Sequence, residues 1–149
     1  MIEHVIRRGR PDDLPGVLAL YRHLHPQDQD PDTAAAERAW TALVSSDTTI
    51  IFLAEAASLL LSSCTLAVIP NLSRGARPYG VIENVVTHAD HRRSGLGRAV
   101  LRAAVDWAWS RNCYKVMLNT GSTSETTLAF YEGAGFLRGG KTYFEVRRS

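Results

Sequence analysis

The sequence has few cysteines and lacks long hydrophobic runs. Its two cysteines, Cys64 and Cys113, lie far apart and match no metal-ligand spacing, so we expect free, buried thiols in a reducing compartment, the cytoplasm. Residues 1–8 lack the apolar stretch of a signal peptide. The longest apolar runs, at residues 59–61 and 66–69, are far too short to cross a bilayer. The sequence therefore predicts neither a metal site nor an association with membranes.

An excess of charge of either sign is also missing. The chain has 17 Lys and Arg against 15 Asp and Glu, which gives a formal net charge of +2 at pH 7. This balance, without an array of basic and aromatic residues, argues against a nucleic-acid partner. What the chain does have is 149 residues, of which 45% are hydrophobic. That is enough for one well-buried core, and no linker divides it, so we expect a single domain over residues 1–149.

Hydrophobic periodicity places strands and helices in alternation along the chain. Apolar runs predict strands at residues 3–8, 48–55, 59–69, 79–87, 115–118, 136–137 and 142–147. Helical spacing, with start and stop signals, predicts a helix that begins at residue 11 and further helices at residues 33–44, 96–109 and 124–133. The second and third strands form a hairpin through residues 56–58. We therefore expect an α/β domain with a mixed, largely antiparallel sheet.

Three polar connections allow more than one interpretation. Residues 25–32 carry three acids and two prolines, and they form either a solvated loop or an acidic wall for a cationic amine. Arg74 and Arg77 follow the third strand, where they either are exposed or meet an anion such as a phosphate. His88 and His91 lie in the turn after the fourth strand. Two histidines without a third ligand do not predict a metal site, and we expect both to be solvated.

Residues 82–98 contain the most informative pattern. An apolar strand is followed by a polar turn, by Gly95 and Gly97, and by an amphipathic helix. The first turn of a helix has free N–H groups and the positive end of the helix dipole, and glycines allow close approach of the backbone, so this arrangement predicts an anion site. Arg92, Arg93 and Arg98 add positive charge beside it.

The same stretch resembles the acetyl-CoA-binding motif of the GNAT superfamily of N-acetyltransferases: Gln or Arg, two variable residues, Gly, any residue, Gly or Ala. Arg92, Gly95 and Gly97 match this motif, and residues 130–136 resemble the later Tyr-x-x-x-Gly-Phe element of the family. The resemblance implies a GNAT-like α/β fold of the α+β type. Its mixed, mostly antiparallel central sheet would have six to seven strands, splayed between the fourth and fifth, and about four flanking helices. It also implies acetyl-CoA as cosubstrate and direct transfer of the acetyl group to a primary amine of a small molecule or peptide.

Three catalytic groups follow from the resemblance. Glu83 is the candidate general base, acting on the amine directly or through a water, although its carboxylate could instead bond within the sheet or orient the acceptor. The backbone N–H of Val85 or Val86 is the candidate donor to the oxyanion. Tyr131 matches a family tyrosine placed near the CoA sulfur and is the candidate general acid, the alternative being an ordinary aromatic residue of the core.

The family assigns the pantetheine arm to strand backbone, the pyrophosphate to the glycine-containing loop, and the ribose 3′-phosphate to an arginine. Asn119 ends the fifth strand, and Ser124 stands where many members have Asn. The residues that the resemblance thus assigns to acetyl-CoA binding are Val85, Val86, Thr87, Arg92, Arg93, Ser94, Gly95, Leu96, Gly97, Arg98, Asn119, Ser124 and Tyr131.

The acceptor stays open at this point. Residues 83–86 also resemble the strand of the glucosamine-6-phosphate acetyltransferases that carries an acidic pair, although the second member here is Asn84. Glu55 and Glu125 are weaker candidates for the base, because no motif supports them. A non-catalytic acyl-CoA-binding sensor or regulatory subunit is the alternative function. Homodimers are common in the family, but no sequence feature requires one.

Overall fold

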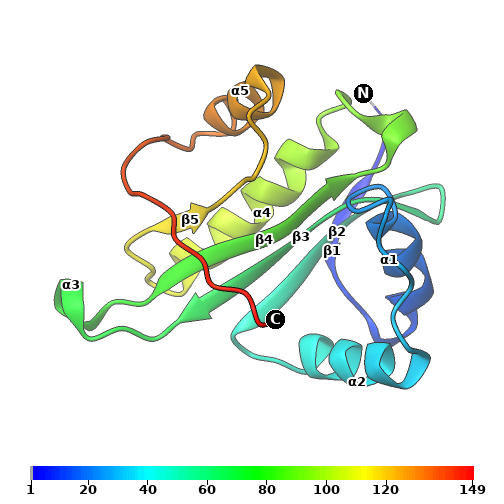
Figure 1. The fold of residues 1–149 in the computed structure, drawn as a ribbon, viewed down its shortest axis with the longest axis horizontal. Coiled ribbons are helices and arrows are strands. Elements are labelled where there is room, and N and C mark those ends of the chain that lie inside the picture. Colours follow the sequence, from blue (N-terminus) through cyan, green and yellow to red (C-terminus); the bar gives the residue numbers. More distant parts are fainter. Residues whose placement is uncertain (1) are drawn as a thin grey trace.

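The computed structural model describes residues 2–149, which form one sheet with helices on both faces (Figure 1). The strands are β1 (Val5–Arg8), β2 (Thr49–Ala56), β3 (Leu59–Ile69), β4 (Tyr79–Thr87) and β5 (Val116–Leu118). The helices are α1 (Leu14–Tyr21), α2 (Thr33–Val44), α3 (Ser73–Ala76), α4 (Leu96–Ser110) and α5 (Glu125–Gly133). Short 3₁₀ turns at Pro11–Asp13 and Ala89–His91 precede α1 and follow β4.

The five strands lie in the order β1-β2-β3-β4-β5, so each strand is hydrogen-bonded to its neighbours along the chain. The first four strands are antiparallel, and β5 joins β4 in parallel after the crossover through α4. The β2–β3 hairpin turns at Ala57 and Ser58, whose φ angles of 48° and 64° are both positive. A two-residue hairpin favours such left-handed positions, so the tight turn forms here without glycine.

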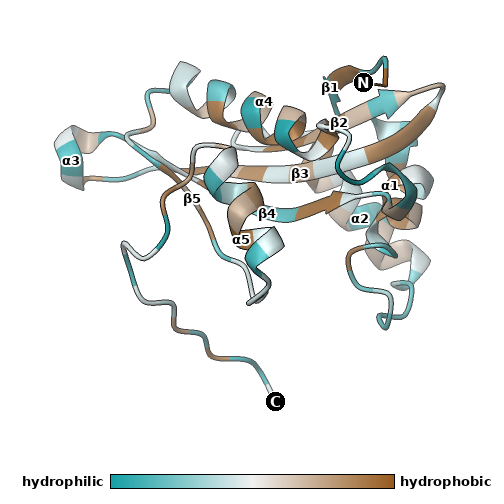
Figure 2. Ribbon diagram, turned by 90° about the horizontal axis from the view of Figure 1, so that it is seen from above, coloured by the Kyte–Doolittle hydropathy of each residue, from teal (hydrophilic) through white to brown (hydrophobic). Residues whose placement is uncertain are grey.

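The two faces of the sheet are covered by different helices, α4 on one side and α1 and α2 on the other (Figure 2). Leu96, Val100 and Leu101 on α4 are buried against Ile82 and Leu66 of the sheet. The opposite face packs Val17 of α1 and Trp40 of α2 against Ile51 and Leu53 of β2. Burying each such side chain contributes about 1.5–3 kcal/mol, so both layers hold the sheet firmly beneath the loops that follow β4.

The expected elements agree with the structure except at the C-terminus. The strands predicted at residues 136–137 and 142–147 are absent, and five strands form instead of six to seven. Leu137 and Phe144 are 97% and 87% exposed, and the C-terminal segment runs away from the sheet (Figure 2). Apolar residues predicted a strand there, but a strand needs a partner for its backbone and a face to bury, and within residues 2–149 this segment finds neither.

The described residues contain five α-helices rather than about four. The additional one, α3, has only four residues and lies in the connection that the sequence assigned to a polar loop. Its Arg74 and Gly75 have left-handed backbone angles, so the segment is a tight turn rather than a regular helix. Among residues 2–149, no helix combines the length and the apolar composition that crossing a membrane requires.

Candidate active site

A β-bulge interrupts β4 in the middle of the sheet. Thr65 of β3 is paired with Glu83, and Ser63 is paired with Val86, so β4 has one more residue than β3 over this stretch. The extra residue is accommodated at Asn84, whose φ of 53° is left-handed. Asn adopts this conformation more readily than most residues, which explains why the bulge forms at this position. Glu83 and Asn84 are consequently exposed beside an otherwise buried strand.

Beyond the bulge, β4 parts from β5. The parallel pairing between the two strands covers only Gly80 to Ile82, whereas β4 continues to Thr87. His88 donates its N–H to the Leu61 carbonyl of β3, and backbone groups alternate between the two sides of a strand, so the N–H groups of Val85 and Thr87 face the gap. The splay that the family resemblance implied is therefore present, and it leaves a short edge of peptide groups available to a ligand.

The loop that follows β4 leads into α4 with its amides free. Arg93 and Gly95 both have left-handed backbone angles, with φ of 62° and 87°. Within residues 2–149, the backbone N–H groups from Arg93 to Arg98 donate no hydrogen bond. A fifteen-residue helix, α4, begins at Leu96 and adds the positive end of its dipole. This loop has the geometry of an anion site, as the sequence pattern predicts.

The two glycines of the motif serve different purposes. A Cβ on Gly95 would meet no atom within 4 Å, so this residue is required by its left-handed backbone and faces open space. A Cβ on Gly97 would lie 3.1 Å from the Phe130 ring and 3.2 Å from Oγ1 of Thr87. Gly97 is therefore needed for the close packing of α4 against α5 and β4, a role that the phosphate-approach argument from sequence did not anticipate.

The polar side chains of the loop are largely engaged by the protein itself. Arg92 donates from Nε to the Thr87 carbonyl and from Nη2 to the His23 carbonyl, each at 3.3 Å. The Ser94 hydroxyl donates to the carbonyl of His91. Arg93 and Arg98 are exposed, and the guanidinium of Arg98 lies beside Gly133 of α5. The free amides, rather than Arg92 or the Ser94 hydroxyl, are therefore the donors that remain available to an anion.

Tyr131 lies on α5 beside the same gap. Its ring packs against Phe130 and Phe136, with ring centroids 5.0 and 6.4 Å away. Burial raises the pKa of Tyr131 above its ordinary value, with smaller contributions in the same direction from Cys64 and Glu83. The phenol is therefore protonated at neutral pH and is able to donate a proton.

A polar cluster that the sequence did not reveal lies on the α1 face next to Glu83. Burial raises the pKa of Tyr21, and the nearby side chains of Thr65, Asn84 and Ser63 partly offset the effect. The Ser63 hydroxyl is buried and has no hydrogen-bond partner within residues 2–149. Tyr21 stood in an ordinary helical pattern, so only the packing of α1 across β3 discloses its position.

Two further predicted residues lie at the edge of this region. Asn119 is exposed immediately after β5. Ser124 is the N-cap residue of α5, but its side chain makes no capping hydrogen bond, and its N–H donates to the Ser122 hydroxyl at 3.2 Å. The structure thus brings the strand, loop and α5 candidates around one gap and leaves Asn119 and Ser124 at its rim.

The weaker candidates for a base have ion-pair partners elsewhere. Glu55 accepts from Nε of Arg7 at 2.5 Å, and the same arginine pairs with Asp13 at 2.7 Å. Glu125 lies 3.8 Å from the guanidinium of Arg138. These carboxylates are held by structural cations, which leaves Glu83 as the exposed carboxylate on the bulged strand.

The polar connections considered for the acceptor are also engaged. Asp30 pairs with Arg22 at 2.8 Å, and Asp32 caps α2 by accepting from the Ala35 N–H at 3.0 Å. Arg77 donates to the carbonyls of Asn112 and Cys113, both at 3.4 Å. Arg77 also precedes Glu83 by six residues along an extended chain, a separation of about 20 Å.

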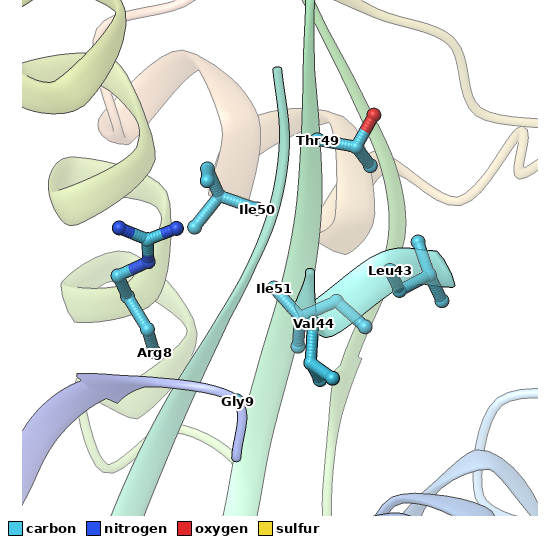
Figure 3. Close-up of a pocket in the computed structure, with 7 residues that line it drawn as sticks. All are labelled: Arg8, Gly9, Leu43, Val44, Thr49, Ile50 and Ile51. Atoms are coloured by element: carbon cyan, nitrogen blue, oxygen red, sulfur yellow. The ribbon is translucent and has the colours of Figure 1, made fainter. Parts of the chain in front are cut away.

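The enclosed hollow shown in Figure 3 is not this site. It lies between the end of β1, the end of α2 and the start of β2, with a volume of about 10 Å³. That is roughly the space that one water occupies, too little for a cosubstrate. Both cysteines are free and buried, as expected, and within residues 2–149 no three metal-ligating side chains cluster around a common point.

Comparison with known proteins agrees with this geometry. Residues 16–136 match the acetyltransferase (GNAT) family, and the chain belongs to that family. Glucosamine 6-phosphate N-acetyltransferase of Trypanosoma brucei brucei is 36% identical over 88 residues, which cover 59% of this chain and 58% of that protein. The chain thus matches a little more than half the length of this relative.

Two further similarities extend over more of the chain. Glucosamine 6-phosphate N-acetyltransferase 1 of Oryza sativa subsp. japonica is 33% identical over 126 residues, 82% of this chain and 73% of that protein. The solved structure titled "Putative acetyltransferase from Agrobacterium tumefaciens str. C58" is 42% identical and superposes with a TM-score of 0.91, covering 97% of this chain and 99% of the other. The GNAT fold is therefore shared over nearly the whole described length.

Proposed function

We propose that the protein transfers the acetyl group of acetyl-CoA to the primary amine of a small molecule, with an amino-sugar phosphate as the acceptor class. The observation that carries the proposal is the row of free backbone amides from Arg93 to Arg98, next to the gap that opens beyond the bulge in β4. When the diphosphate of CoA binds these amides, the pantetheine arm lies along the gap, where the N–H groups of Val85 and Thr87 are available.

The residues around the gap supply the three needs of acetyl transfer. Glu83 takes a proton from the acceptor ammonium, directly or through a water, so that the amine lone pair can attack the thioester carbon. The Val85 N–H donates to the oxyanion that then forms, because its position on the strand faces the gap. As the carbon–sulfur bond breaks, the Tyr131 phenol gives its proton to the departing CoA thiolate; the nitrogen then releases its second proton to solvent, which leaves the neutral amide, and a proton from solvent restores the phenol.

The acceptor class follows from the polar groups near Glu83 and from the named relatives. Tyr21, Thr65 and Asn84 present hydroxyl and amide groups rather than an acidic surface, which suits a polyhydroxylated sugar better than a polyamine. Two of the three acids expected to attract a polyamine are engaged, Asp30 by Arg22 and Asp32 by the start of α2. The relatives from T. brucei and rice carry the name glucosamine 6-phosphate N-acetyltransferase, which supports the same choice.

The experiment is steady-state acetylation of a panel of amines by the purified protein with acetyl-CoA. Glucosamine 6-phosphate, glucosamine, spermidine and an aminoglycoside are compared, and we expect the first to have the highest kcat/KM. Equal rates for glucosamine with and without its phosphate would remove the phosphate from the proposal, and preferred turnover of spermidine would refute the acceptor class.

Two variants test the catalytic assignment and distinguish an enzyme from a CoA-binding sensor. Glu83→Gln removes the base and should lower kcat about 10²–10⁴-fold, and Tyr131→Phe removes the acid with a loss in the same range. Neither should change the Kd for CoA by more than about twofold, because neither supplies the amides of the loop. Glu125→Gln is the matched control, since it removes an exposed carboxylate that pairs with Arg138. Wild-type turnover by both variants would refute the catalytic assignment, whereas CoA binding by the wild type without turnover of any amine would favour the sensor.

A further inference from the structure

The loop that follows β4 is tied to the C-terminal end of α1, 66–69 residues earlier in the chain. The Ala89 N–H donates to Nδ1 of His23 at 3.3 Å, and Nη2 of Arg92 donates to the His23 carbonyl at 3.3 Å. Nε of Arg92 also donates to the Thr87 carbonyl at 3.3 Å. One arginine and one histidine thus connect the end of β4, its loop and helix α1.

Two further histidines extend this connection. The rings of His23 and His88 stack with their centroids 4.1 Å apart, and the ring of His91 meets His88 edge-on at 5.3 Å. His88 accepts the Asp90 N–H at its Nδ1, at 3.2 Å. All three rings are partly buried rather than freely solvated, which corrects the expectation from sequence for His88 and His91.

We propose that His23 and Arg92 are positioning residues, which together form a strap that holds the free amides of the loop in the arrangement that binds the CoA diphosphate. The inference rests on the proposed function, because it requires the diphosphate to lie on this loop. Arg92 acts because its guanidinium donates hydrogen bonds to two carbonyls. Its charge is not used to bind the phosphate. His23 acts through Nδ1 as an acceptor, which places its proton on Nε2.

A charge on the His23 ring would break the strap, because protonated Nδ1 can no longer accept the Ala89 N–H. The groups that face this ring are His88, Arg92 and Asp90. Burial lowers the pKa of His23. The charges of His88 and Arg92 lower this pKa further, whereas the charge of Asp90 raises it. The strap is therefore intact at neutral pH and opens as the pH falls below the ordinary range of histidine, about 6.5.

The test measures CoA binding by calorimetry at pH 8.0 and 5.5, together with KM and kcat, on the full chain. His23→Ala removes the acceptor, and at pH 8.0 we expect a Kd about three- to tenfold higher, the range expected for one lost hydrogen bond. His23→Asn keeps an acceptor that cannot titrate, so its Kd should be close to that of the wild type at pH 8.0 and below it at pH 5.5. Both effects should appear in KM for acetyl-CoA with kcat within about twofold.

Arg92→Lys separates the strap from a simple charge effect. Lysine keeps the positive charge but cannot bridge two carbonyls, so we expect a Kd about tenfold higher in this variant, comparable to that of Arg92→Ala. His25→Ala is the matched control, since His25 is exposed on the same segment and its ring makes no hydrogen bond within residues 2–149. Thermal melts of each variant establish that it is folded before binding is measured.

The outcomes separate the two proposals. If the wild type binds CoA and both His23→Ala and Arg92→Lys bind as tightly as His25→Ala, the strap is refuted and the proposed function stands. If the wild type does not bind CoA, both fail. Should His23→Ala not fold, the pH dependence of His23→Asn decides, and a decline in affinity at pH 5.5 equal to that of the wild type overturns the role of His23.

Discussion

The Gly97 contact with Phe130 predicts a stability defect that a second substitution relieves. A Cβ on Gly97 would lie 3.1 Å from the Phe130 ring and 3.2 Å from Thr87 Oγ1, closer than ordinary van der Waals contact. Gly97→Ala therefore forces the Phe130 ring to tilt away from α4. Overpacking of this kind costs about 1–3 kcal/mol, and each kcal/mol lowers the Tm of a chain of this size by roughly 2–4 °C.

The measurement is a double-mutant cycle by urea denaturation on the wild type, Gly97→Ala, Phe130→Leu and the double variant. Phe130→Leu removes the ring atoms that a Cβ at position 97 would meet, so the double variant should be more stable than the sum of the single effects predicts, by about 1 kcal/mol. Strict additivity, or a Gly97→Ala variant as stable as the wild type, would refute the reasoning. If Gly97 served only the close approach of phosphate, Gly97→Ala would be as stable as the wild type but would bind CoA more weakly. Phe130→Leu would then not restore the lost affinity.

Three other outcomes follow from the structure. Gly95→Ala should lower stability by about 1 kcal/mol, because a left-handed backbone is costly for alanine even in open space, and thermal melts would detect the change. Arg7 holds the pKa of Asp13 below its usual value, so Asp13→Asn should cost about 1–3 kcal/mol at pH 7. Because stability from a lowered pKa is present above the unfolded value and is lost as the pH falls, that difference should shrink below pH 4 in denaturation at several pH values. Cys64, whose pKa burial raises to about 12, should react with iodoacetamide only on unfolding, and prompt labelling of the native protein would contradict its burial.

Much of the fold could be predicted because local pattern and tertiary environment agree. The bounds expected for residues 33–44, 59–69 and 79–87 are those of α2, β3 and β4. The C-terminal segment shows where a pattern is insufficient: apolar residues form a strand only where a partner strand is available, and residues 142–147 have none within the described chain. The turn at Ala57 and Ser58 carries no glycine signal, and its geometry is imposed by the strands that it joins.

The candidate site was predictable where one segment carries its chemistry. The glycine-containing loop and the helix that follows it are continuous in sequence, so the pattern locates the free amides. His23 and Tyr21 belong to α1 or its end, and they reach the site only because that helix packs across β3 and β4. The hydrogen-bond partners of Arg92 could not be predicted either, because its guanidinium donates to the carbonyls of Thr87 and His23, which only the folded structure brings together.

The bulge at Asn84 also changes the phase of β4. Before it, Ile82 faces α4 and Glu83 faces α1; after it, Val85 and Thr87 face α4, although unbroken alternation would turn both toward α1. Deleting Asn84 would remove the bulge but would leave Val85 and Thr87 in regular alternation on the α4 face, so Thr87 would keep its contact with Gly97. A substitution such as Asn84→Gly preserves the count of residues. What the extra residue adds is therefore the left-handed backbone at Asn84, and not the faces on which Val85 and Thr87 lie.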